Sequence, residues 1–381
     1  MKRRVVLIVL DSVGIGALPD AHLFSDTGAH TLGNIYKISG GLDLPNMYSM
    51  GLSEIEDSRL PKFDGKIIGA FGRAAEKSSG KDTTSGHWEL MGVISEKGFK
   101  TYTENGFPAE LIEEFENRIG SKTLGNYAAS GTEIIQVLGA EHQKTGFPIV
   151  YTSADSVLQI AAHENTVSLE RLYMMCKIAR ELIDEGGYNI ARVIARPFVG
   201  NSESGYTRTP NRRDYSVEPP STTVLDKLLQ MGYVTVGVGK IDDIFAGRGV
   251  AIAEHSKNNK GSIDATIRYL KSDEGDFIFT NLVDFDMLYG HRNDYEGYRN
   301  ALEYFDYRLP EVISAMKDND LLIITADHGC DPTFPGTDHT REYIPILVYN
   351  KRMTGAMPLG TVDSFMHVGG LVFNFLTTQA L

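Results

Sequence analysis

The stretch LLIITADHGCDPTFPGTDHT, residues 321–340, joins a short apolar run to a cluster of polar side chains. Asp327 and His328 follow the apolar run closely, and His339 comes eleven residues after His328. An apolar run bounded in this way is typical of a buried strand in a parallel sheet. Because polar groups at the end of a buried strand are costly when unpaired, these three residues are candidate ligands.

Two other apolar runs end in the same way. Val5–Leu10 runs directly into Asp11, and residues 277–282 run into VDFDMLYGH, which contains Asp284, Asp286 and His291. A single residue of this kind is more often a cap or a loop hydrogen bonder than a ligand. Open α/β sheets place their ligands at the carboxyl ends of strands, so three strands that end this way favour a binding site.

These side chains are carboxylates and imidazoles without a thiolate. Such a set suits manganese, zinc or another divalent ion. One catalytic ion normally takes three or four protein ligands, and the candidates outnumber that, so we expect two ions.

Apolar runs and amphipathic segments together indicate an α/β fold. Helical spacing in 224–229 follows Ser221 as the expected N-cap, and helical spacing in 301–309 precedes Pro310, which should kink or end that helix. Alternation of strands and helices predicts a mainly parallel sheet with helices on both faces. The expected strands of this sheet are 5–10, 234–238, 277–282, 321–324 and 344–348.

The middle of the chain carries elements of its own. Helical spacing runs through 168–187, and 150–160 and 192–199 are expected strands. At 381 residues the chain exceeds what one compact core usually fills. We therefore expect a discontinuous core with an inserted domain. The predicted domains are 1–98 together with 221–381 for the core, and 99–220 for the inserted α+β domain.

Composition restricts the partners. The net charge of −13 argues against nucleic acid or an anionic membrane as a main partner, because both require a basic face. Two cysteines, Cys176 and Cys330, exclude a disulfide framework and indicate a reducing cytoplasm. The start MKRRVVLIVLDS superficially suggests a signal peptide, but Asp11 breaks its short apolar run, and we interpret it as the first buried strand.

A candidate nucleophile lies in GKDTTSGHWELMG, which begins at Gly80 and offers Thr83, Thr84 and Ser85 in a row. Any one of these hydroxyls is more often a cap at the start of a helix. A hydroxyl at a helix N-terminus between two cations is also where a phosphate ester would be stabilised. Spacing alone does not choose among the three.

Longer motifs of the chain resemble the bacterial type of phosphopentomutase, a family of the alkaline phosphatase superfamily. The resemblance covers nearly the whole chain. It is carried by DSVGIGALPDA, GKDTTSGHWE, GNYAASGTEI, VYTSADSVLQIAAHE, RVIARPFVG, YTRTPNRRDY, NLVDFDMLYGHR, ITADHG and PGTDHTREYIPIL. It implies an alkaline-phosphatase-like core with an inserted cap domain. Cys330 departs from the family pattern, in which asparagine is expected.

The resemblance also implies roles for particular residues. The family's nucleophilic threonine directly follows Lys-Asp, which selects Thr83, carried as a phosphothreonine that bridges two Mn²⁺ ions. The two implied ligand sets are Asp11, Asp327 and His328 for one ion, and Asp286, His291 and His339 for the other. The implied substrate-binding residues are Ser153, Asp155, Arg192, Arg196, Arg208 and Lys240.

The activity implied by the resemblance is interconversion of ribose 1-phosphate and ribose 5-phosphate, and of the deoxyribose pair. A bisphosphorylated sugar, glucose 1,6-bisphosphate or ribose 1,5-bisphosphate, would act as activator. One rival is a two-metal phosphomonoester hydrolase on the same core. A rival of another class is a metal-stabilised protein that binds sugar phosphates without turnover. Release of inorganic phosphate separates the mutase from the hydrolase, and a turnover assay tests the binding protein.

Overall fold

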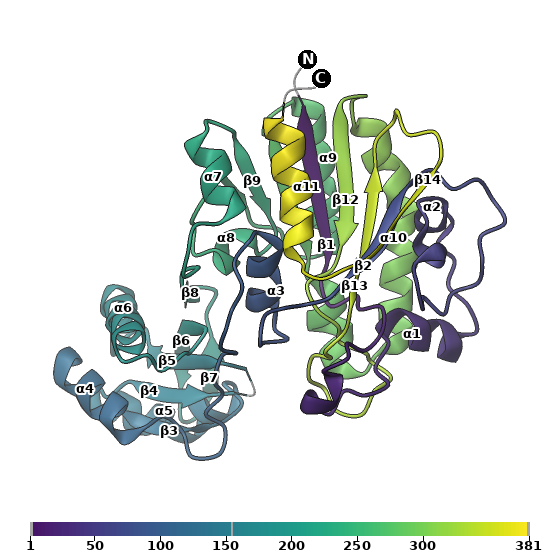
Figure 1. Cartoon of the computed structure of the whole chain (residues 1–381). Helices are drawn as coiled ribbons and strands as arrows, with labels where there is room; N and C mark the ends of the chain where they lie inside the picture. Colours follow the sequence, from purple (N-terminus) through teal and green to yellow (C-terminus); the bar gives the residue numbers. More distant parts are fainter. Residues whose placement is uncertain (1–2, 154, 379–381) are drawn as a thin grey trace. The chain divides into compact units, whose positions relative to one another are not determined.

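A computed structural model describes residues 3–153 and 155–378 of the chain. These residues form two compact units. The larger comprises the described residues up to Lys97 and from Pro219 onward, and the smaller spans Gly98–Glu218. Figure 1 shows the elements of both units, coloured along the sequence. No helix in the described ranges is both long and apolar enough to cross a lipid bilayer.

The larger unit contains one eight-stranded sheet, with β1 (Arg4–Leu10) near its middle. All seven residues of β1 are buried, as expected for a strand covered on both faces. In sheet order the strands are β10 (Ile252–Glu254), β9 (Thr235–Val238), β11 (Phe277–Leu282), β1, β12 (Asp320–Thr325), β13 (Ile344–Tyr349), β2 (Gly69–Ala74) and β14 (Ala356–Val362).

The register of the central strands brings their carboxyl ends together. Strand β1 pairs in parallel with β11 on one side and with β12 on the other, with Leu10 opposite Leu282 and Val9 opposite Thr325. The residues that directly follow these three strands therefore lie at one edge of the sheet.

Strand β13 runs against its two neighbours, β12 and β2. Our expectation that 344–348 belongs to the parallel set was therefore wrong. The chain between β12 and β13 contains no assigned helix and returns as a loop, whereas a parallel neighbour is usually reached through a crossover helix. Because β2 is antiparallel to β13 and parallel to β14, the other seven strands share one direction.

Helices cover both faces of this sheet. Helix α11 (Met366–Thr377) packs on β1 and contacts α3 (Thr83–Leu90) and α7 (Val224–Gln230), whereas α9 (Asn259–Ser272) packs on β11 and contacts α10 (Tyr295–Ala315). Figure 1 shows α11 in front of the sheet and α9 and α10 behind it. The predicted fold class, a mainly parallel sheet between two helical layers, is confirmed.

One local expectation was wrong, and one of two alternatives for another is excluded. Helix α7 is capped by Thr223 rather than Ser221: the Thr223 side chain accepts a hydrogen bond from Asp226 N, and the Asp226 carboxylate accepts one from Thr223 N. Pro310 lies inside α10, which continues to Ala315, so the helix does not end at Pro310.

The shorter helical segments of this unit are η1 (Ala21–Phe24), α1 (Thr31–Ser39), α2 (Pro45–Ser49), η2 (Leu52–Glu54), α8 (Ile241–Ile244), η3 (Phe285–Tyr289) and η4 (Gly290–Arg292).

The smaller unit is built on a second sheet with helices on both faces. Its strands are β3 (Leu124–Ala128), β4 (Ile149–Thr152), β5 (Val157–His163), β6 (Arg192–Asn201), β7 (Gly205–Arg208) and β8 (Arg213–Ser216). Residues 150–160, expected as one strand, fall in the antiparallel strands β4 and β5.

Alternating side chains of this second sheet divide between two apolar clusters. Val150 and Ile160 belong to the cluster formed with α4 (Ala109–Ile119) and α6 (Leu169–Glu185). Tyr151 and Ala161, one residue further along, belong to the cluster formed with α5 (Glu133–Thr145). This period-2 division follows from the pleat of a strand.

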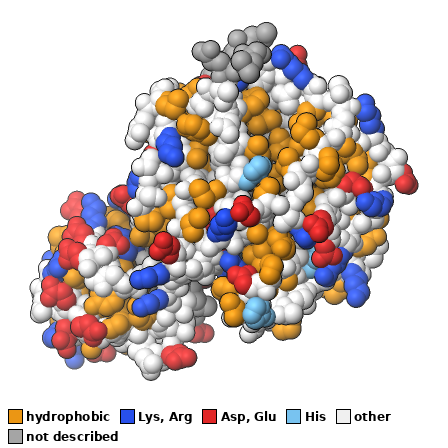
Figure 2. Space-filling view, in the orientation of Figure 1, with side chains coloured by type: hydrophobic (Ala, Val, Ile, Leu, Met, Phe, Trp, Pro, Cys, Tyr) orange, Lys and Arg blue, Asp and Glu red, His pale blue; other side chains and the backbone are white. Residues whose placement is uncertain are grey.

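Charged side chains of both signs lie interspersed on the face shown in Figure 2. The net charge of −13 is therefore accompanied on this face by lysine and arginine side chains among the acidic ones.

Candidate metal centre and active site

The first group of candidate ligands lies where β1 and β12 end. Asp11 directly follows β1, and Asp327 and His328 follow β12. Nε2 of His328 lies 3.5 Å from Oδ1 of Asp11 and 3.4 Å from Oδ2 of Asp327, and all three side chains are buried. Ser12, at a φ of 71°, turns the chain so that its N–H donates to Oδ1 of Asp327 at 3.0 Å. A left-handed serine directly after a candidate ligand is a strained position of the kind found at functional sites.

The second group comes from the segment after β11 and from the loop after β12. Asp286 lies in η3, His291 in η4, and His339 in the loop beside the bridge that joins Gly329 to Thr340. Nε2 of His291 lies 3.2 Å from Oδ2 of Asp286, and Nε2 of His339 lies 3.3 Å from its Oδ1. The two Nε2 atoms are 3.1 Å apart, so all three side chains converge on one point.

The spacing in both groups fits a cation. Ligands placed tetrahedrally at about 2.0–2.2 Å from a metal lie roughly 3.3–3.6 Å from one another, close to the distances observed. Nδ1–H of His291 donates to Thr337 O at 2.6 Å and that of His328 to Gly329 O at 3.0 Å, so each Nε2 faces its own ligand group and is the atom that could bind a metal. Metal-binding histidines are characteristically held in this manner.

Three buried carboxylate oxygens of these groups find no hydrogen-bond partner within the described residues. They are Oδ1 of Asp11, Oδ1 of Asp286 and Oδ2 of Asp327. Each lies instead 3.0–3.5 Å from an imidazole nitrogen, that of His328, His339 or His87, and buried carboxylates crowded in this way favour a cation beside them. The residues present therefore fit divalent metal ions.

The two groups are neighbours. The rings of His328 and His339 have centroids 4.0 Å apart, and ligand atoms of Asp286, His328 and His339 lie within 4.8 Å of one another. Two ions held by adjacent groups could clamp both oxygens of an in-line displacement.

The crowding of acidic side chains shifts the pKa values of the candidate ligands. Burial raises the pKa of Asp11, and the neighbouring Asp327 raises it further. Burial alone would lower the pKa of His328, but Asp327 and Asp11 raise it well above its usual value. Although burial would raise the pKa of Asp286, His339 and His291 hold it well below its usual value. A protonated His328 therefore balances the carboxylates of the first group where a metal ion would otherwise do so, and metal binding there should release a proton.

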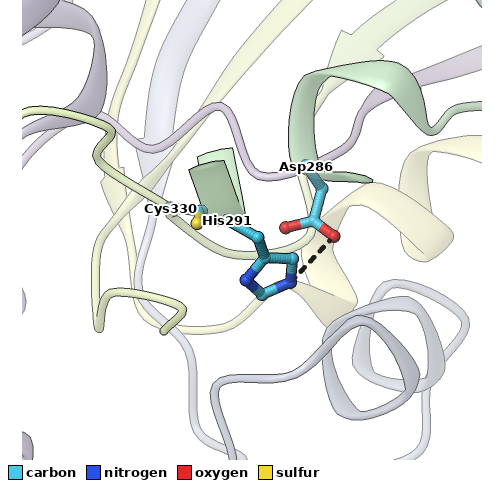
Figure 3. A group of neighbouring side chains, drawn as sticks. All are labelled: Asp286, His291 and Cys330. Atoms are coloured by element: carbon cyan, nitrogen blue, oxygen red, sulfur yellow. Dashed lines mark ion pairs between the residues drawn. The ribbon is translucent and has the colours of Figure 1, made fainter. Parts of the chain in front are cut away.

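Cys330 lies at the edge of the second group (Figure 3). Its thiol is buried, and Sγ lies 3.6 Å from Asp338 O. This Sγ also lies within 4.8 Å of a carboxylate oxygen of Asp286 and of a ring nitrogen of His291. Burial, followed by the charge of Asp286, raises the pKa of the thiol well above its usual value. The side chain is therefore a neutral thiol beside the carboxylate and imidazole ligands.

Asp284, a further polar residue after β11, has a different role. Its Oδ2 accepts a hydrogen bond from Asn259 N at 2.8 Å, and Asp284 N donates to Oδ1 of Asn259 at 2.9 Å. These reciprocal bonds fix the start of α9, so Asp284 acts as a structural cap.

The three consecutive hydroxyls after Asp82 occupy different environments. Asp82 is the N-cap of α3 and accepts hydrogen bonds from N and Oγ of Ser85, at 3.0 and 2.7 Å. The capping role therefore belongs to Asp82 and Ser85. Oγ1 of Thr83 lies instead 3.1 Å from Nε2 of His328, within the first ligand group.

Comparison with known proteins shows the family to which the chain belongs. Residues 3–380 match the model of the metalloenzyme superfamily. The chain is 56% identical over 372 residues to a phosphopentomutase of Caldanaerobacter subterraneus subsp. tengcongensis, which covers 98% of this chain and 94% of the relative. It is 57% identical over 366 residues to a phosphopentomutase of Carboxydothermus hydrogenoformans, with coverage of 96% and 94%. The chain belongs to the phosphopentomutase family.

Family membership makes the chain a mutase, and the superfamily implies that it binds divalent metal ions. Among solved structures, a protein from Pyrococcus horikoshii shares the fold with a TM-score of 0.53 at 15% identity, covering 100% of this chain and 99% of that one. The resemblance seen in the sequence motifs is confirmed by the two phosphopentomutase relatives.

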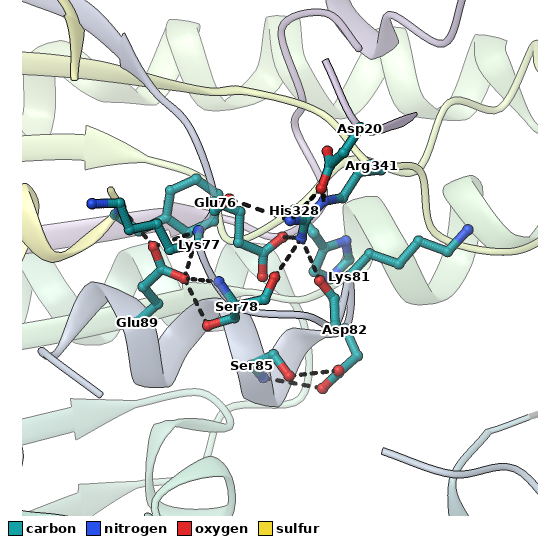
Figure 4. A network of polar contacts seen from close by, with 12 residues as sticks. Asp20, Glu76, Lys77, Ser78, Lys81, Asp82, Ser85, Glu89, His328 and Arg341 are labelled. Atoms are coloured by element: carbon teal, nitrogen blue, oxygen red, sulfur yellow. Dashed lines mark hydrogen bonds and ion pairs between the residues drawn. The ribbon is translucent and has the colours of Figure 1, made fainter. Parts of the chain in front are cut away.

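Arg341, which the sequence did not single out, holds the loop before Thr83 in this member of the phosphopentomutase family (Figure 4). The Arg341 guanidinium is buried and donates to Ser78 O at 2.8 Å, to Gly80 O at 2.6 Å and to Oε2 of Glu76 at 2.7 Å. The same side chain pairs with Asp20 at 3.0 Å. Because Arg341 lies two residues after His339, it ties the loop before Thr83 to the loop that carries His339.

The candidate substrate residues of the smaller unit form two groups. Arg192 pairs with Asp155 at 3.5 Å. Arg196 donates from Nε to Oε1 of Gln159 at 3.0 Å, and burial, with Arg212 and Arg208 nearby, lowers its pKa to about 10.

This second group includes two residues that the sequence did not single out, Arg212 and Tyr151. Burial raises the pKa of Tyr151, whereas Arg208, Arg196 and Arg212 act in the opposite direction. Three guanidinium groups around one buried phenol would suit an anion. Of the remaining candidates, Ser153 follows β4, and Lys240 follows β9 in the larger unit.

Proposed function

We propose that the chain is a phosphopentomutase that interconverts ribose 1-phosphate and ribose 5-phosphate, and the corresponding 2-deoxyribose phosphates. The observation that carries this proposal is the position of Thr83. In a chain of this family, the hydroxyl that begins α3 lies 3.1 Å from a histidine of a two-group ligand cluster. A nucleophile beside two cation sites is the arrangement that phosphoryl transfer requires.

In this proposal the two ions are Mn²⁺, each held by two kinds of ligand. Asp11, Asp327 and His328 hold one ion, and Asp286, His291 and His339 hold the other. Ions bound there would neutralise charge on the transferring phosphoryl group and on the oxygens that attack and leave. Carboxylate and imidazole ligands are compatible with manganese, and the neutral thiol of Cys330 stays outside the set.

The reaction begins from an enzyme phosphorylated on Thr83. The sugar monophosphate attacks with its free hydroxyl, the bond from phosphorus to Oγ1 of Thr83 breaks, and the hydroxyl proton is released. The sugar becomes a bisphosphate. In the second transfer Oγ1 of Thr83 loses its proton and attacks the phosphorus at the other end, the bond from that phosphorus to the sugar oxygen breaks, the sugar oxygen takes up a proton, and the isomeric monophosphate leaves. A bisphosphorylated sugar, glucose 1,6-bisphosphate or ribose 1,5-bisphosphate, supplies the first phosphoryl group.

Other residues of the chain bind the substrate in this proposal. Arginines of the smaller unit, Arg192, Arg196 and Arg208, together with Lys240, bind the phosphate that is not reacting, because a planar guanidinium pairs well with phosphate oxygens. Ser153 and Asp155 accept hydrogen bonds from ribose hydroxyls. The smaller unit, 98–218, acts as a cap that limits access of water during transfer. Free thiols and the acidic charge fit a cytoplasmic enzyme of sugar phosphates.

A single assay tests the proposal against the hydrolase that the same core could form. Purified protein is incubated with ribose 1-phosphate, with and without Mn²⁺ and with glucose 1,6-bisphosphate as activator. Ribose 5-phosphate is measured by a coupled reaction, and inorganic phosphate is measured in parallel. We expect manganese-dependent formation of ribose 5-phosphate with little phosphate released. Stoichiometric release of phosphate would instead indicate a hydrolase, and no product of either kind would indicate a binding protein.

A further inference from the structure

His87 lies one helical turn after Thr83 and connects the start of α3 to the first ligand group. Its side chain is fully buried, and Nδ1 lies 2.9 Å from Thr83 O and 3.0 Å from Oδ2 of Asp327. On the other side of the ring, Nε2 lies 3.2 Å from Nδ2 of Asn281, which also donates to Oδ2 of Asp11 at 3.0 Å. A continuous polar chain therefore runs from the nucleophile's own carbonyl to both carboxylates of that group.

The hydrogen bonds determine which nitrogen of His87 carries the proton. If the Asn281 amide were reversed, its oxygen would face the Asp11 carboxylate, and two acceptors cannot form a hydrogen bond. The amide nitrogen Nδ2 therefore faces Asp11 and His87. An amide nitrogen only donates, so Nε2 of His87 accepts, and the proton of the neutral ring is on Nδ1. That N–H faces Thr83 O and Asp327, the two groups whose separation sets the geometry of the site.

A contribution to the stability of the fold does not explain why an asparagine occupies position 281. It is fully buried in β11, whose six residues are all buried, and its Oδ1 has no hydrogen-bond partner within the described part of the chain. A buried amide oxygen without a partner destabilises a protein. The residue's useful atom is therefore Nδ2, which is shared between Asp11 and His87.

The surroundings hold this chain of contacts rigidly. The His87 ring stacks on Phe279, with centroids 5.8 Å apart and planes at 30°. Helix α3 also lies directly against the segment after β12, because a Cβ added at Gly86 would lie 2.0 Å from Asp327 O. Two positions of one helix thus fix the distance between Thr83 and Asp327.

We propose that His87 is a positioning residue which, with Asn281, fixes Thr83 relative to Asp11 and Asp327 and so relative to the metal ion they hold. This inference rests on the proposed function, because it takes Thr83 as the nucleophile. His87 is fully buried and contacts the carbonyl oxygen of Thr83, not Oγ1. Its effect is exerted through the orientation of two carboxylates and of the first turn of α3.

The test replaces His87 in the full-length protein and measures metal binding apart from turnover. His87→Leu removes both polar contacts and keeps a buried side chain of similar size. We expect the affinity of the metal-free protein for Mn²⁺, measured by calorimetry, to fall by about 10–100-fold. The kcat of the manganese-loaded protein should fall by a similar factor, with KM within about threefold, because His87 does not bind the sugar phosphate.

Two conservative variants separate positioning from packing. The amide nitrogen of His87→Asn occupies nearly the place of Nδ1, so this variant keeps the donor to Thr83 O and Asp327 and should recover much of the metal affinity. His87→Gln places its amide near the position of Nε2 and should recover less. His142→Leu is the matched control, since His142 is equally buried, with both ring nitrogens hydrogen-bonded, but lies in the smaller unit. It should lower thermal stability and leave manganese affinity unchanged.

The inference is overturned if His87→Leu binds Mn²⁺ and turns over within twofold of the unmodified protein. It is also overturned if its losses match those of His142→Leu. Should His87→Leu not fold, an undiminished manganese affinity and kcat in His87→Gln would overturn it equally. Thr83→Ala is measured alongside. If Thr83→Ala stays active, the proposed function fails, whereas an inactive Thr83→Ala with an unaffected His87→Leu refutes only the role of His87.

Discussion

The Oγ1 atom of Thr83 lies 3.1 Å from Nε2 of His328, although 245 positions separate the two residues along the chain. Thr83 begins a helix and His328 follows a central strand, so the contact depends on how α3 packs beside the carboxyl edge of the sheet. Ser85, two residues further along, hydrogen-bonds to the cap residue Asp82 instead. The helix start therefore presents one of its hydroxyls to the ligand cluster and uses another for capping.

Thr83→Ala should reduce mutase turnover by at least about a thousandfold, as expected when a covalent nucleophile is removed. Thr84→Ala should retain much of the activity. Ser85→Ala loses a hydrogen bond at the helix start, so it should cost about 1 kcal/mol of stability and also retain much of the activity. Initial rates with ribose 1-phosphate and urea unfolding of the three variants check this. Near-normal turnover in Thr83→Ala would exclude the covalent mechanism.

His339→Ala and Asp286→Ala should each lower the bound metal from about two ions per chain toward one, because both residues belong to the second ligand group. Elemental analysis of protein loaded with manganese and then passed over a desalting column gives the count. His255→Ala is the matched control, since His255 is exposed and lies 4.0 Å from a single carboxylate, that of Asp242. Two ions per chain in both His339→Ala and Asp286→Ala would contradict the ligand assignment.

Arg341→Met should lower the free energy of unfolding by about 3–5 kcal/mol, because it leaves Glu76 buried beside no cation. Burial already raises the pKa of Glu76 well above its usual value despite the neighbouring Arg341. Arg341→Lys should recover little, since one ammonium in the place of Nη1 would leave Asp20 and Glu76 O without the contacts that Nε and Nη2 make. Urea unfolding measures the change. Arg118→Ala, which breaks exposed ion pairs with Glu114 and Glu185, should leave stability nearly unchanged.

The site residues differ in how visible they are in the sequence. Asp11, Asp286 and Asp327 follow apolar runs directly or closely, and parallel pairing of those runs brings the residues to one edge, so pattern alone predicted a cluster. Strand direction was not visible for β13, because an apolar run of six residues reads the same in either orientation. The buried amide of Asn281, inside the apolar run FIFTNL, was a usable signal of function.

Arg341 and His87 could not have been assigned from the sequence, because their partners are remote. The carbonyl of Ser78 lies 263 positions from Arg341, and Asn281 lies 194 positions from His87. An arginine near a histidine, or a histidine one turn after a threonine, has no distinctive pattern. These roles follow from tertiary packing, which spacing along the chain does not encode.

His142 should make the protein less stable as the pH falls below about 6.5, the usual pKa of histidine. In the folded chain its Nδ1–H donates to Phe147 O at 2.7 Å and its Nε2 accepts from His163 N at 2.8 Å, so the ring is neutral. Burial lowers its pKa from the usual value. The unfolded chain therefore binds the proton first, and stability is lost by up to about 1.4 kcal/mol per pH unit.

The measurement is the free energy of unfolding in urea at pH 8, 7, 6 and 5, with a chelator present throughout to remove the contribution of bound metal. His142→Leu should be less stable at pH 8 and should show a shallower decline between pH 7 and pH 5. Parallel pH profiles for the two proteins would mean that His142 does not titrate differently on folding.

The replacement of both Arg192 and Arg208 by alanine should slow the mutase reaction far more than hydrolysis of a small aryl phosphate. A bisphosphate intermediate must turn end for end, so a cationic group has to bind whichever phosphate is not reacting. An aryl phosphate has only the reacting phosphate and needs no such group. We therefore expect the ratio of mutase to aryl phosphatase activity to fall by about 100-fold or more, as for two charge-assisted phosphate contacts.

The control for this double variant removes the same charge from the same unit. Arg118 and Arg180 lie in α4 and α6 and pair with acidic side chains that are largely exposed. Replacing both by alanine should leave the ratio of the two activities unchanged. If the Arg192 and Arg208 variant loses both activities equally, these arginines support the fold or the metal core. Losing contacts to the non-reacting phosphate cannot slow hydrolysis of an aryl phosphate, because that substrate has only the reacting phosphate.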